Sequence, residues 1–336
     1  MTATPATAAP TVPAAPPDAL GRAAALVAPA LDAAVDRLSP ELVGPIRHHL
    51  AGGGKRVRAA LVLVSAAAAG GAEETGIPGA VAIELVHNFS LLHDDIIDED
   101  RDRRHRPTVW AQFGIGPAII AGDALAALAT QVLLDDPTPE RVRATATLAT
   151  ATQEMIAGQA DDMAFETRSS VTVEECLRMA TGKTGALLSC ASSLGAVLVG
   201  APDSTVKALA DFGRNVGIAF QAIDDVLGIW GEPSQTGKPA GNDLVQHKMT
   251  LPVVSALERV DGRRPELEAL LSRTLDGQDV VEAARIIEES GARDAAMDIA
   301  ESHLEAALTS LDRADLLPGP RSQLEAIAHF VTERDR

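Results

Sequence analysis

Apolar side chains recur every three or four residues through almost the whole chain, and this spacing limits what the chain can fold into. Residues 81–92 are typical, because Val81, Leu85, Phe89 and Leu92 would lie along one face of an α-helix. The composition agrees, since tyrosine is absent and aromatic residues make up only 2% of the chain, whereas strands are enriched in them. We therefore predict an all-α fold.

Glycine and proline mark the expected ends of these helices. The breaks fall at Gly52–Gly54, Gly70–Gly71, Pro78–Gly79, Asp136–Pro137, Gly200–Pro202 and Pro318–Pro320. No change in composition marks a second domain, so residues 18–336 are predicted to form one. Residues 1–17 are rich in alanine, threonine and proline and lack a basic start, which predicts a disordered arm and not a signal peptide.

The overall charge excludes several classes of partner. A net charge of −18 argues against nucleic acids and anionic membrane surfaces, which both require a basic face. Charges or glycines interrupt the apolar runs before roughly 18 residues, so no stable membrane insertion is expected. The two cysteines, Cys176 and Cys190, lie in helical patterns and are expected to be buried thiols and not a disulfide, as in a cytoplasmic protein.

Asp94, Asp95 and Asp98 form an acidic cluster at the end of an apolar helical stretch. Since Asp94 and Asp98 would lie one turn apart, their carboxylates repel one another. Protonation, a surface location or a bound divalent cation could relieve this repulsion. The apolar surroundings favour the cation, and Mg²⁺ is the ion that typically uses one or two carboxylates together with phosphate oxygens.

A second acidic pair, Asp224 and Asp225, interrupts another apolar helical stretch. Between Trp230 and Pro252 the sequence is rich in glycine, proline and charged residues, and a loop this long inside a helical protein is usually functional. The basic residues concentrate at 55–58 and 101–106. Two acidic clusters and two basic runs together point to magnesium and diphosphate.

Further motifs follow in a fixed order along the chain. They are Gly53–Arg58, His87–Asp98, Arg103–Arg104, Pro107–Thr108, Gly122–Asp123, Gly158–Gln159 with Asp162, Lys183–Thr184, Gln221–Asp225, and Thr236–Lys238 with Gly241–Asp243 and Lys248. In these motifs the sequence resembles the trans-isoprenyl diphosphate synthases, or polyprenyl synthetases, and most of all bacterial geranylgeranyl diphosphate synthases. The resemblance implies a single helical bundle around a central cavity, of the isoprenoid synthase type, and a homodimer.

The resemblance also implies a role for each matching residue. The Mg²⁺ ligands would be Asp94, Asp95, Asp98, Asp224 and Asp225, and the residues that contact the allylic diphosphate or its metals would be Arg103, Lys183, Thr184, Gln221 and Lys238. The diphosphate of isopentenyl diphosphate would be held by Lys55, Arg58, His87 and Arg104. Lys248 is a further substrate-binding candidate, and the residues with catalytic roles would be Asp94, Asp95, Asp98, Arg103, Lys183 and Lys238.

The sequence departs from the family pattern at two places. Gly228 stands where many members have a third aspartate, and Gln221 with a water molecule could fill that place. His105 and Arg106 follow the arginine pair where glycine is common, and the sequence offers no physical reason for that change.

The implied reaction joins isopentenyl diphosphate to an allylic diphosphate. Phe89 and Ser90, about one turn before Asp94, would control chain length, and they favour geranylgeranyl diphosphate as product, with farnesyl diphosphate as the alternative. A terpene cyclase would need no second anion pocket, and a non-catalytic subunit would be expected to have lost aspartates such as Asp94.

Single residues also have plainer interpretations. A lone histidine such as His87 is often a hydrogen-bonded core residue, and Arg103 and Arg104 could pair with Asp100 and Asp102 at the surface. Lys183 in a helix would ordinarily face solvent. The acidic residues with an expected structural role are Asp123 and Asp162.

Overall fold

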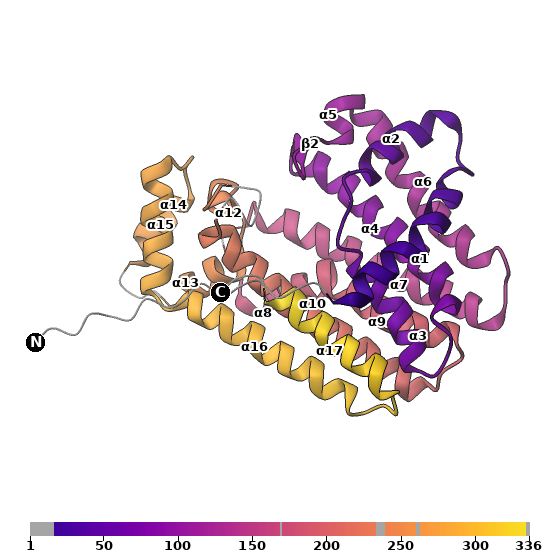
Figure 1. Cartoon of the computed structure of the whole chain (residues 1–336). Helices are drawn as coiled ribbons and strands as arrows, with labels where there is room; N and C mark the ends of the chain where they lie inside the picture. Colours follow the sequence, from indigo (N-terminus) through magenta and orange to yellow (C-terminus); the bar gives the residue numbers. More distant parts are fainter. Residues whose placement is uncertain (1–16, 169, 233–238, 260–262, 334–336) are drawn as a thin grey trace, which may run out of the picture.

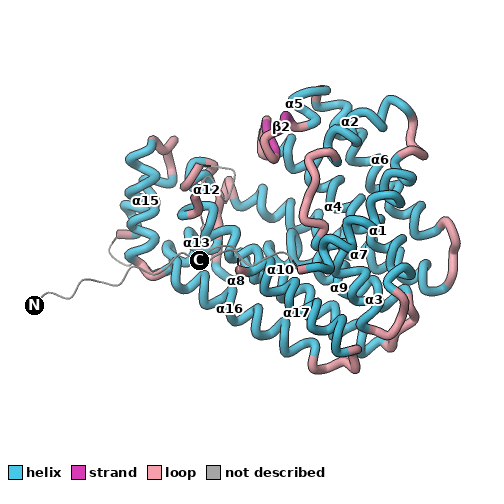
Figure 2. Tube along the Cα trace, in the orientation of Figure 1, coloured by secondary structure: helices cyan, strands magenta, loops and turns pink. Residues whose placement is uncertain are grey.

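Helices make up almost all of the structure, as the apolar spacing predicts (Figure 2). The computed structural model describes residues 17–168, 170–232, 239–259 and 263–333, so most of the predicted arm at residues 1–17 lies outside the described residues. Among the described residues the only strands are β1 (Asp102–Arg103) and β2 (Arg106–Pro107), which pair antiparallel. The all-α prediction is confirmed.

The N-terminal half contains α1 (Asp18–Val35), α2 (Pro40–Leu50), α3 (Val57–Ala68), the short 3₁₀ helix η1 (Glu73–Gly76), α4 (Ile77–Ile97), α5 (Val109–Phe113), α6 (Ile115–Leu134) and α7 (Pro139–Phe165). The central part contains α8 (Val173–Ala180), the π-helical turn η2 (Thr181–Gly185), α9 (Ala186–Leu198) and α10 (Asp203–Trp230). The C-terminal part contains α12 (Asn242–Val245), α13 (Leu251–Arg259), α14 (Arg264–Leu271), α15 (Gly277–Glu289), α16 (Ala292–Leu311) and α17 (Pro318–Thr332).

Prolines begin several helices and do not interrupt them. Pro78 and Pro318 lie in the first turn of α4 and α17, where the missing N–H is not needed for a helical hydrogen bond. The breaks predicted at these two prolines therefore fall slightly earlier, and α4 follows directly after η1. At α8 the start is fixed by a capping box between Thr172 and Glu175.

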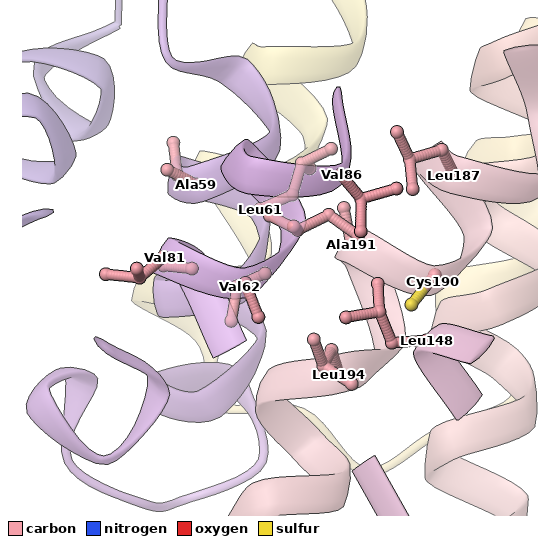
Figure 3. Close-up of a cluster of buried hydrophobic side chains, with 14 of the residues drawn as sticks. Ala59, Leu61, Val62, Val81, Val86, Leu148, Leu187, Cys190, Ala191 and Leu194 are labelled. Carbon is pink, nitrogen blue, oxygen red and sulfur yellow. The ribbon is translucent and has the colours of Figure 1, made fainter. Parts of the chain in front are cut away.

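The largest core joins helices that are distant in sequence. Leu61 and Val62 of α3, Val86 of α4 and Leu194 of α9 belong to one buried cluster (Figure 3). Cys190 lies in the same cluster, and both cysteines are buried and unpaired, so the predicted thiols are confirmed. In Figure 1, α16 and α17 run along one side of the bundle, while α14 and α15 stand at its far end.

A cavity of about 450 Å³ lies inside the bundle. Its walls come from the loop before α3, from α4, α7, η2, α9, α10 and α17, and from the β1–β2 hairpin. The predicted arrangement of one helical bundle around a central cavity is therefore confirmed.

Helix α6 bears on the expectation that the chain does not insert into a membrane. Among the described residues, α6 is long and apolar enough to cross a membrane by length and composition, although 39% of its apolar window is buried in the protein. Asp123 lies in the middle of α6 with 68% of its side chain exposed. Length and composition cannot distinguish a spanning helix from a core helix of this kind, so the expectation of no stable membrane insertion stays a prediction.

Candidate active site

The first aspartate cluster lies at the C-terminal end of α4. Asp94 lines the cavity, Asp95 is buried, and Asp98 is the residue that follows the helix. Burial raises the pKa of Asp94 to about 6, although the positive charge of Lys183 opposes this shift. Asp95 Oδ1 accepts a hydrogen bond from Arg103 Nε at 2.6 Å, whereas its Oδ2 is buried and has no hydrogen-bond partner among the described residues.

The second cluster lies on α10, and its two carboxylates have different surroundings. Asp224 lines the cavity. Asp225 is buried, and it accepts hydrogen bonds from Gln221 Nε2 at 2.8 Å and from the backbone N–H of Leu251 at 2.9 Å. Burial raises the pKa of Asp225 to about 7 despite these two bonds. Asp225 therefore also fastens the start of α13 to α10.

Both ends of the Gln221 side chain are engaged. Its Oε1 accepts a hydrogen bond from Thr184 Oγ1 at 2.6 Å, and its amide nitrogen donates to Asp225. The suggestion that Gln221 and a water molecule replace the aspartate missing at Gly228 stays a prediction, because the Gln221 oxygen keeps a second lone pair after it accepts from Thr184.

Lys183 and Thr184 reach the cavity from the π-helical turn η2. Such turns insert one residue into a helix and are frequent at functional sites. Lys183 Nζ forms an ion pair with Asp162, and the negative charges of Asp162, Asp94 and Asp98 together raise its pKa. Lys183 is thus a half-buried cation beside the first aspartate cluster and not a solvent-facing lysine. Asp162 pairs with this lysine, and its structural role stays a prediction.

The carboxylates fit a hard divalent cation that is shared with a phosphate ligand. Asp95 has a buried oxygen without a partner, and burial disfavours the charged form of Asp94, so a cation would relieve both. In the described part of the chain no three His, Cys, Asp or Glu side chains are close enough to form a complete metal site alone. This agrees with Mg²⁺, which usually keeps several waters and takes further oxygens from its substrate.

The same cavity also carries positive charge. Arg58, His87 and Arg104 line it, and Arg58 Nη1 lies 3.3 Å from His87 Nε2. Burial and the charges of Arg58 and Arg104 hold the pKa of His87 well below its usual range, so the imidazole is neutral. Burial also lowers the pKa of both arginines, and Arg58 Nε is buried without a hydrogen-bond partner among the described residues. An anion bound here would supply the missing partner.

Three supporting residues of this pocket were not among the predicted site residues, namely Arg56, Glu84 and Phe330. Arg56 pairs with Glu84 at 2.6 Å, and Glu84 also accepts a hydrogen bond from the N–H of Ala59, which ties α3 to α4. Lys55 Nζ lies 4.8 Å from the ring centre of Phe330, so α17 closes this end of the cavity. Arg56 stands inside a sequence motif, but no local signal identifies Glu84 or Phe330.

The hairpin between β1 and β2 shows why glycine is favoured at the position where this chain has His105. Arg103 pairs with Arg106, so Arg104 and His105 are the two turn residues, and their φ angles are +51° and +60°. A two-residue hairpin turn of type I′ needs positive φ at both positions, which glycine adopts most easily. His105 therefore occupies a position that favours glycine, and the turn presents Arg104 to the cavity.

The other predicted site residues lie in different places. Lys248 lies 3.6 Å from Asp98, so it belongs to the first aspartate cluster. Asp123 is exposed and 3.8 Å from His93, outside the cavity. Arg103 pairs with Asp95 and not with a surface carboxylate. Lys238 falls outside the described residues.

The two chain-length candidates differ in position. Ser90 lines the cavity, whereas Phe89 packs against the main core beside it, with its ring centre 5.0 Å from that of His93. The apolar side chains that line the cavity include Leu91, Met155, Leu187, Leu188 and Phe220.

His49 is a neighbour of the site that the sequence did not single out. Together with Arg103, Arg104 and Asp95 it lines a small recess of about 20 Å³ behind the hairpin. Burial and the charge of Arg103 lower its pKa to about 4, so it is neutral at physiological pH. In the sequence, His48 and His49 are simply adjacent histidines of a helical stretch, and nothing there indicates that His49 lies beside the site.

Comparisons with known proteins show which family this chain belongs to. The polyprenyl synthetase family model matches residues 39–287. The chain is 42% identical to (2E,6E)-farnesyl diphosphate synthase of Mycobacterium tuberculosis, over 94% of this chain and 92% of that protein. It is 40% identical to geranylgeranyl diphosphate synthase of the same species, over 94% and 93%. The crystal structure of polyprenyl synthetase from Streptomyces coelicolor A3(2) superposes with a TM-score of 0.90 at 45% identity, covering 94% of this chain and 98% of that one.

The fold and the cavity therefore define an all-α prenyltransferase. The chain belongs to the polyprenyl synthetase family, and the resemblance seen in the sequence motifs is confirmed.

Proposed function

We propose that the chain uses Mg²⁺ to condense isopentenyl diphosphate with an allylic diphosphate, and that its main product is geranylgeranyl diphosphate. The observation that carries the proposal is that one cavity is lined both by the carboxylates of Asp94 and Asp224 and by Arg58, His87 and Arg104. An anion carried by metal ions fits the carboxylates, and an anion bound directly by arginine fits the basic residues.

Each group has a task in this reaction. Magnesium, when bound, would neutralise the charge that develops on the allylic diphosphate as its carbon–oxygen bond breaks. Lys183 and Arg103 hold positive charge beside the same carboxylates and would contact that diphosphate. The isopentenyl double bond attacks the allylic cation, and the departing diphosphate takes the proton that is lost. The described chain needs no nucleophile for these steps.

Incubation with Mg²⁺, labelled isopentenyl diphosphate and one of three allylic primers tests the proposal. The primers are dimethylallyl, geranyl and farnesyl diphosphate, and the products are dephosphorylated and separated by length. A twenty-carbon alcohol from every primer is the expected result, and an end point at fifteen carbons would establish the farnesyl alternative. Hydrocarbons formed from one allylic diphosphate alone would instead establish a cyclase, and no product from any primer would favour a non-catalytic subunit.

Arg104→Ala is expected to raise the KM for isopentenyl diphosphate while kcat changes little. The variant removes one cation from the second anion pocket, where Arg58 and His87 remain. Loss of a charge-assisted hydrogen bond of about 1.5–3 kcal/mol corresponds to an increase in KM of roughly 10- to 150-fold. Steady-state kinetics with each substrate varied in turn measure this increase in KM.

Arg101→Ala is the matched control, because Arg101 is an exposed neighbour that stacks on Trp110 outside the cavity. Its kinetic constants are expected to match those of the parent enzyme. An equal rise in the KM for the allylic diphosphate in Arg104→Ala would contradict the assignment of Arg104 to the second pocket.

Phe89→Ala is expected to lengthen the product by at least one five-carbon unit. The change opens space behind Ser90, which lines the cavity beside its apolar wall. Loss of a partly buried phenylalanine also lowers the free energy of unfolding, by up to about 3 kcal/mol, so the assay is run well below the melting temperature. Product chromatography gives the result.

Ser90→Phe provides the opposite test, because it adds an aromatic side chain to the cavity wall and is expected to shorten the product. If both variants retain the parent product profile, chain length is limited elsewhere.

We also propose that the chain forms a homodimer through α6 and α7. Three apolar side chains of α6 are 53%, 42% and 56% exposed, namely Ile115, Ile119 and Ile120, and exposed apolar side chains continue onto the adjacent α7 at Ile156 and Met163. Exposed apolar surface of this kind marks interaction sites. A lipid environment fits less well, because the exposed carboxylate of Asp123 would carry a high desolvation cost in a bilayer.

Ile119→Glu with Ile120→Glu is expected to reduce the mass in sedimentation equilibrium from two chains to one, since two buried charges would oppose the contact. Val281→Glu is the control, because Val281 is a comparably exposed apolar residue on the distant α15. A parent protein that sediments as a monomer at all concentrations would contradict the dimer.

A further inference from the structure

The Gly122–Asp123 motif has no part in the chemistry proposed for the cavity, and its glycine lies on the buried face of α6. A Cβ atom placed on Gly122 would lie 2.3 Å from His93 Nε2 and 2.6 Å from His93 Cδ2. These distances are far below any van der Waals contact, so a side chain at position 122 would displace the imidazole. Glycine therefore lets His93, which comes from α4, lie directly on the backbone of α6.

A hydrogen bond fixes the imidazole at this place. His93 Nε2 lies 3.1 Å from the carbonyl oxygen of Ile119. A carbonyl oxygen only accepts hydrogen bonds, so Nε2 carries the proton and donates it. The carboxylate of Asp123 lies 3.8 Å from the same nitrogen, but its side chain is 68% exposed, so this ion pair contributes little. We call the carbonyl of Ile119 and the bare backbone at Gly122 the α6 socket.

The same imidazole supports a residue that is expected to control chain length. Phe89 precedes His93 by one helical turn, and the two rings meet edge to face, with centres 5.0 Å apart and planes at 82°. Phe89 is half-buried and also packs against the main core. His93 is not among the described residues that line the cavity, so it joins Phe89 to the backbone of α6 from outside the cavity.

We infer that His93, seated in the α6 socket, determines product length by holding the ring of Phe89 in place. The inference deepens the proposed function and rests on it, because product length has a meaning only for a chain that elongates a prenyl diphosphate. His93 acts through Phe89 and is therefore a positioning residue. Without the imidazole, the ring of Phe89 can turn toward α6, and the space behind Ser90 becomes deeper for the growing product.

Product length with farnesyl diphosphate as primer tests this inference. His93→Ala is expected to lengthen the main product by at least one five-carbon unit. Phe89→Ala combined with His93→Ala is expected to give the same products as Phe89→Ala alone, because both changes act through one contact. His93→Gln is expected to keep the parent products, because its amide N–H can donate to the carbonyl of Ile119 and its side chain fills most of the same space.

His303→Ala is the control for these products. It also removes a half-buried imidazole with a hydrogen bond, but His303 lies on α16 outside the cavity and bonds to Asn215. Its products are expected to match those of the parent enzyme.

Melting temperatures test the α6 socket without any turnover. Gly122→Ala is expected to lower the Tm by at least about 3 °C, because the added methyl group collides with the imidazole. In the His93→Ala background the same change is expected to shift the Tm by less than about 1 °C, because the group it collides with is gone. Gly116→Ala is the control on the same helix, because no other group lies within 4 Å of its added Cβ atom, and its effect is expected to be equal in both backgrounds.

The outcomes separate the inference from the proposed function. If the parent chain forms no prenyl product, the proposed function fails, and the inference about product length fails with it. If the parent elongates its primer but His93→Ala keeps the parent products, or if the effects of Phe89→Ala and His93→Ala add, the inference is overturned while the proposed function stands. An equal loss of Tm for Gly122→Ala in both backgrounds would overturn the α6 socket.

Discussion

Asp94→Asn is expected to lower kcat by at least about a thousandfold while the protein remains folded, which corresponds to about 4 kcal/mol of lost transition-state stabilisation. Asp94 is the residue of the first cluster that lines the cavity, and an amide cannot replace its charge toward a metal ion. Asparagine has nearly the same size, so packing is preserved. Because burial already disfavours the charged form of Asp94, the melting temperature without Mg²⁺ is expected to stay equal or rise.

Single-turnover kinetics at saturating Mg²⁺ and differential scanning fluorimetry measure these two effects. Asp123→Asn is the matched control, because it makes the same chemical change at an exposed position outside the cavity. Its activity is expected to remain within about threefold of the parent. If Asp94→Asn retained a tenth of the parent activity, the carboxylate could not be a principal metal ligand.

Gly158→Ala is expected to lower both the free energy of unfolding and the turnover of the protein. A Cβ atom on Gly158 would lie 2.2 Å from the backbone nitrogen of Lys183, because α7 packs directly against the π-helical turn. Backbone atoms cannot rotate away, so the turn must move. We expect the free energy of unfolding to fall by about 2 kcal/mol, and kcat to fall at least about tenfold, because Lys183 moves with the turn.

Chemical denaturation and steady-state kinetics measure the two losses. Gly21→Ala is the matched control, because Gly21 is exposed in α1 and no other group lies within 4 Å of an added Cβ atom. Alanine is the better helix former, so this control is expected to gain up to about 1 kcal/mol of stability. Equal stability of the two variants would show that the α7–η2 contact can relax without cost.

The sequence predicted the architecture well because the information it used is local. Apolar spacing and proline positions report on single helices, and Asp94 and Asp224 lie on such helices. Their meeting across one cavity followed from the family resemblance and not from the spacing, because nothing local fixes how α4 and α10 pack.

What the sequence missed depends on contacts between distant segments or on backbone conformation. Glu84 looks like any acidic residue of an amphipathic helix until Arg56 is placed beside it. The π-helical turn at Lys183 has the composition of an ordinary helix. Residue types in a motif therefore identify the chemistry, while the partners of each group depend on how distant segments pack.

The β1–β2 hairpin has a consequence for protein engineering. Rules for stabilising turns recommend Asn-Gly for two positions of positive φ, and Arg104 and His105 occupy both positions at a cost of about 1 kcal/mol or more. A consensus or thermostability library would readily select that replacement, and the gain in melting temperature would come with loss of a guanidinium from the cavity. Stability screens of this enzyme should therefore keep position 104 fixed and vary position 105 alone.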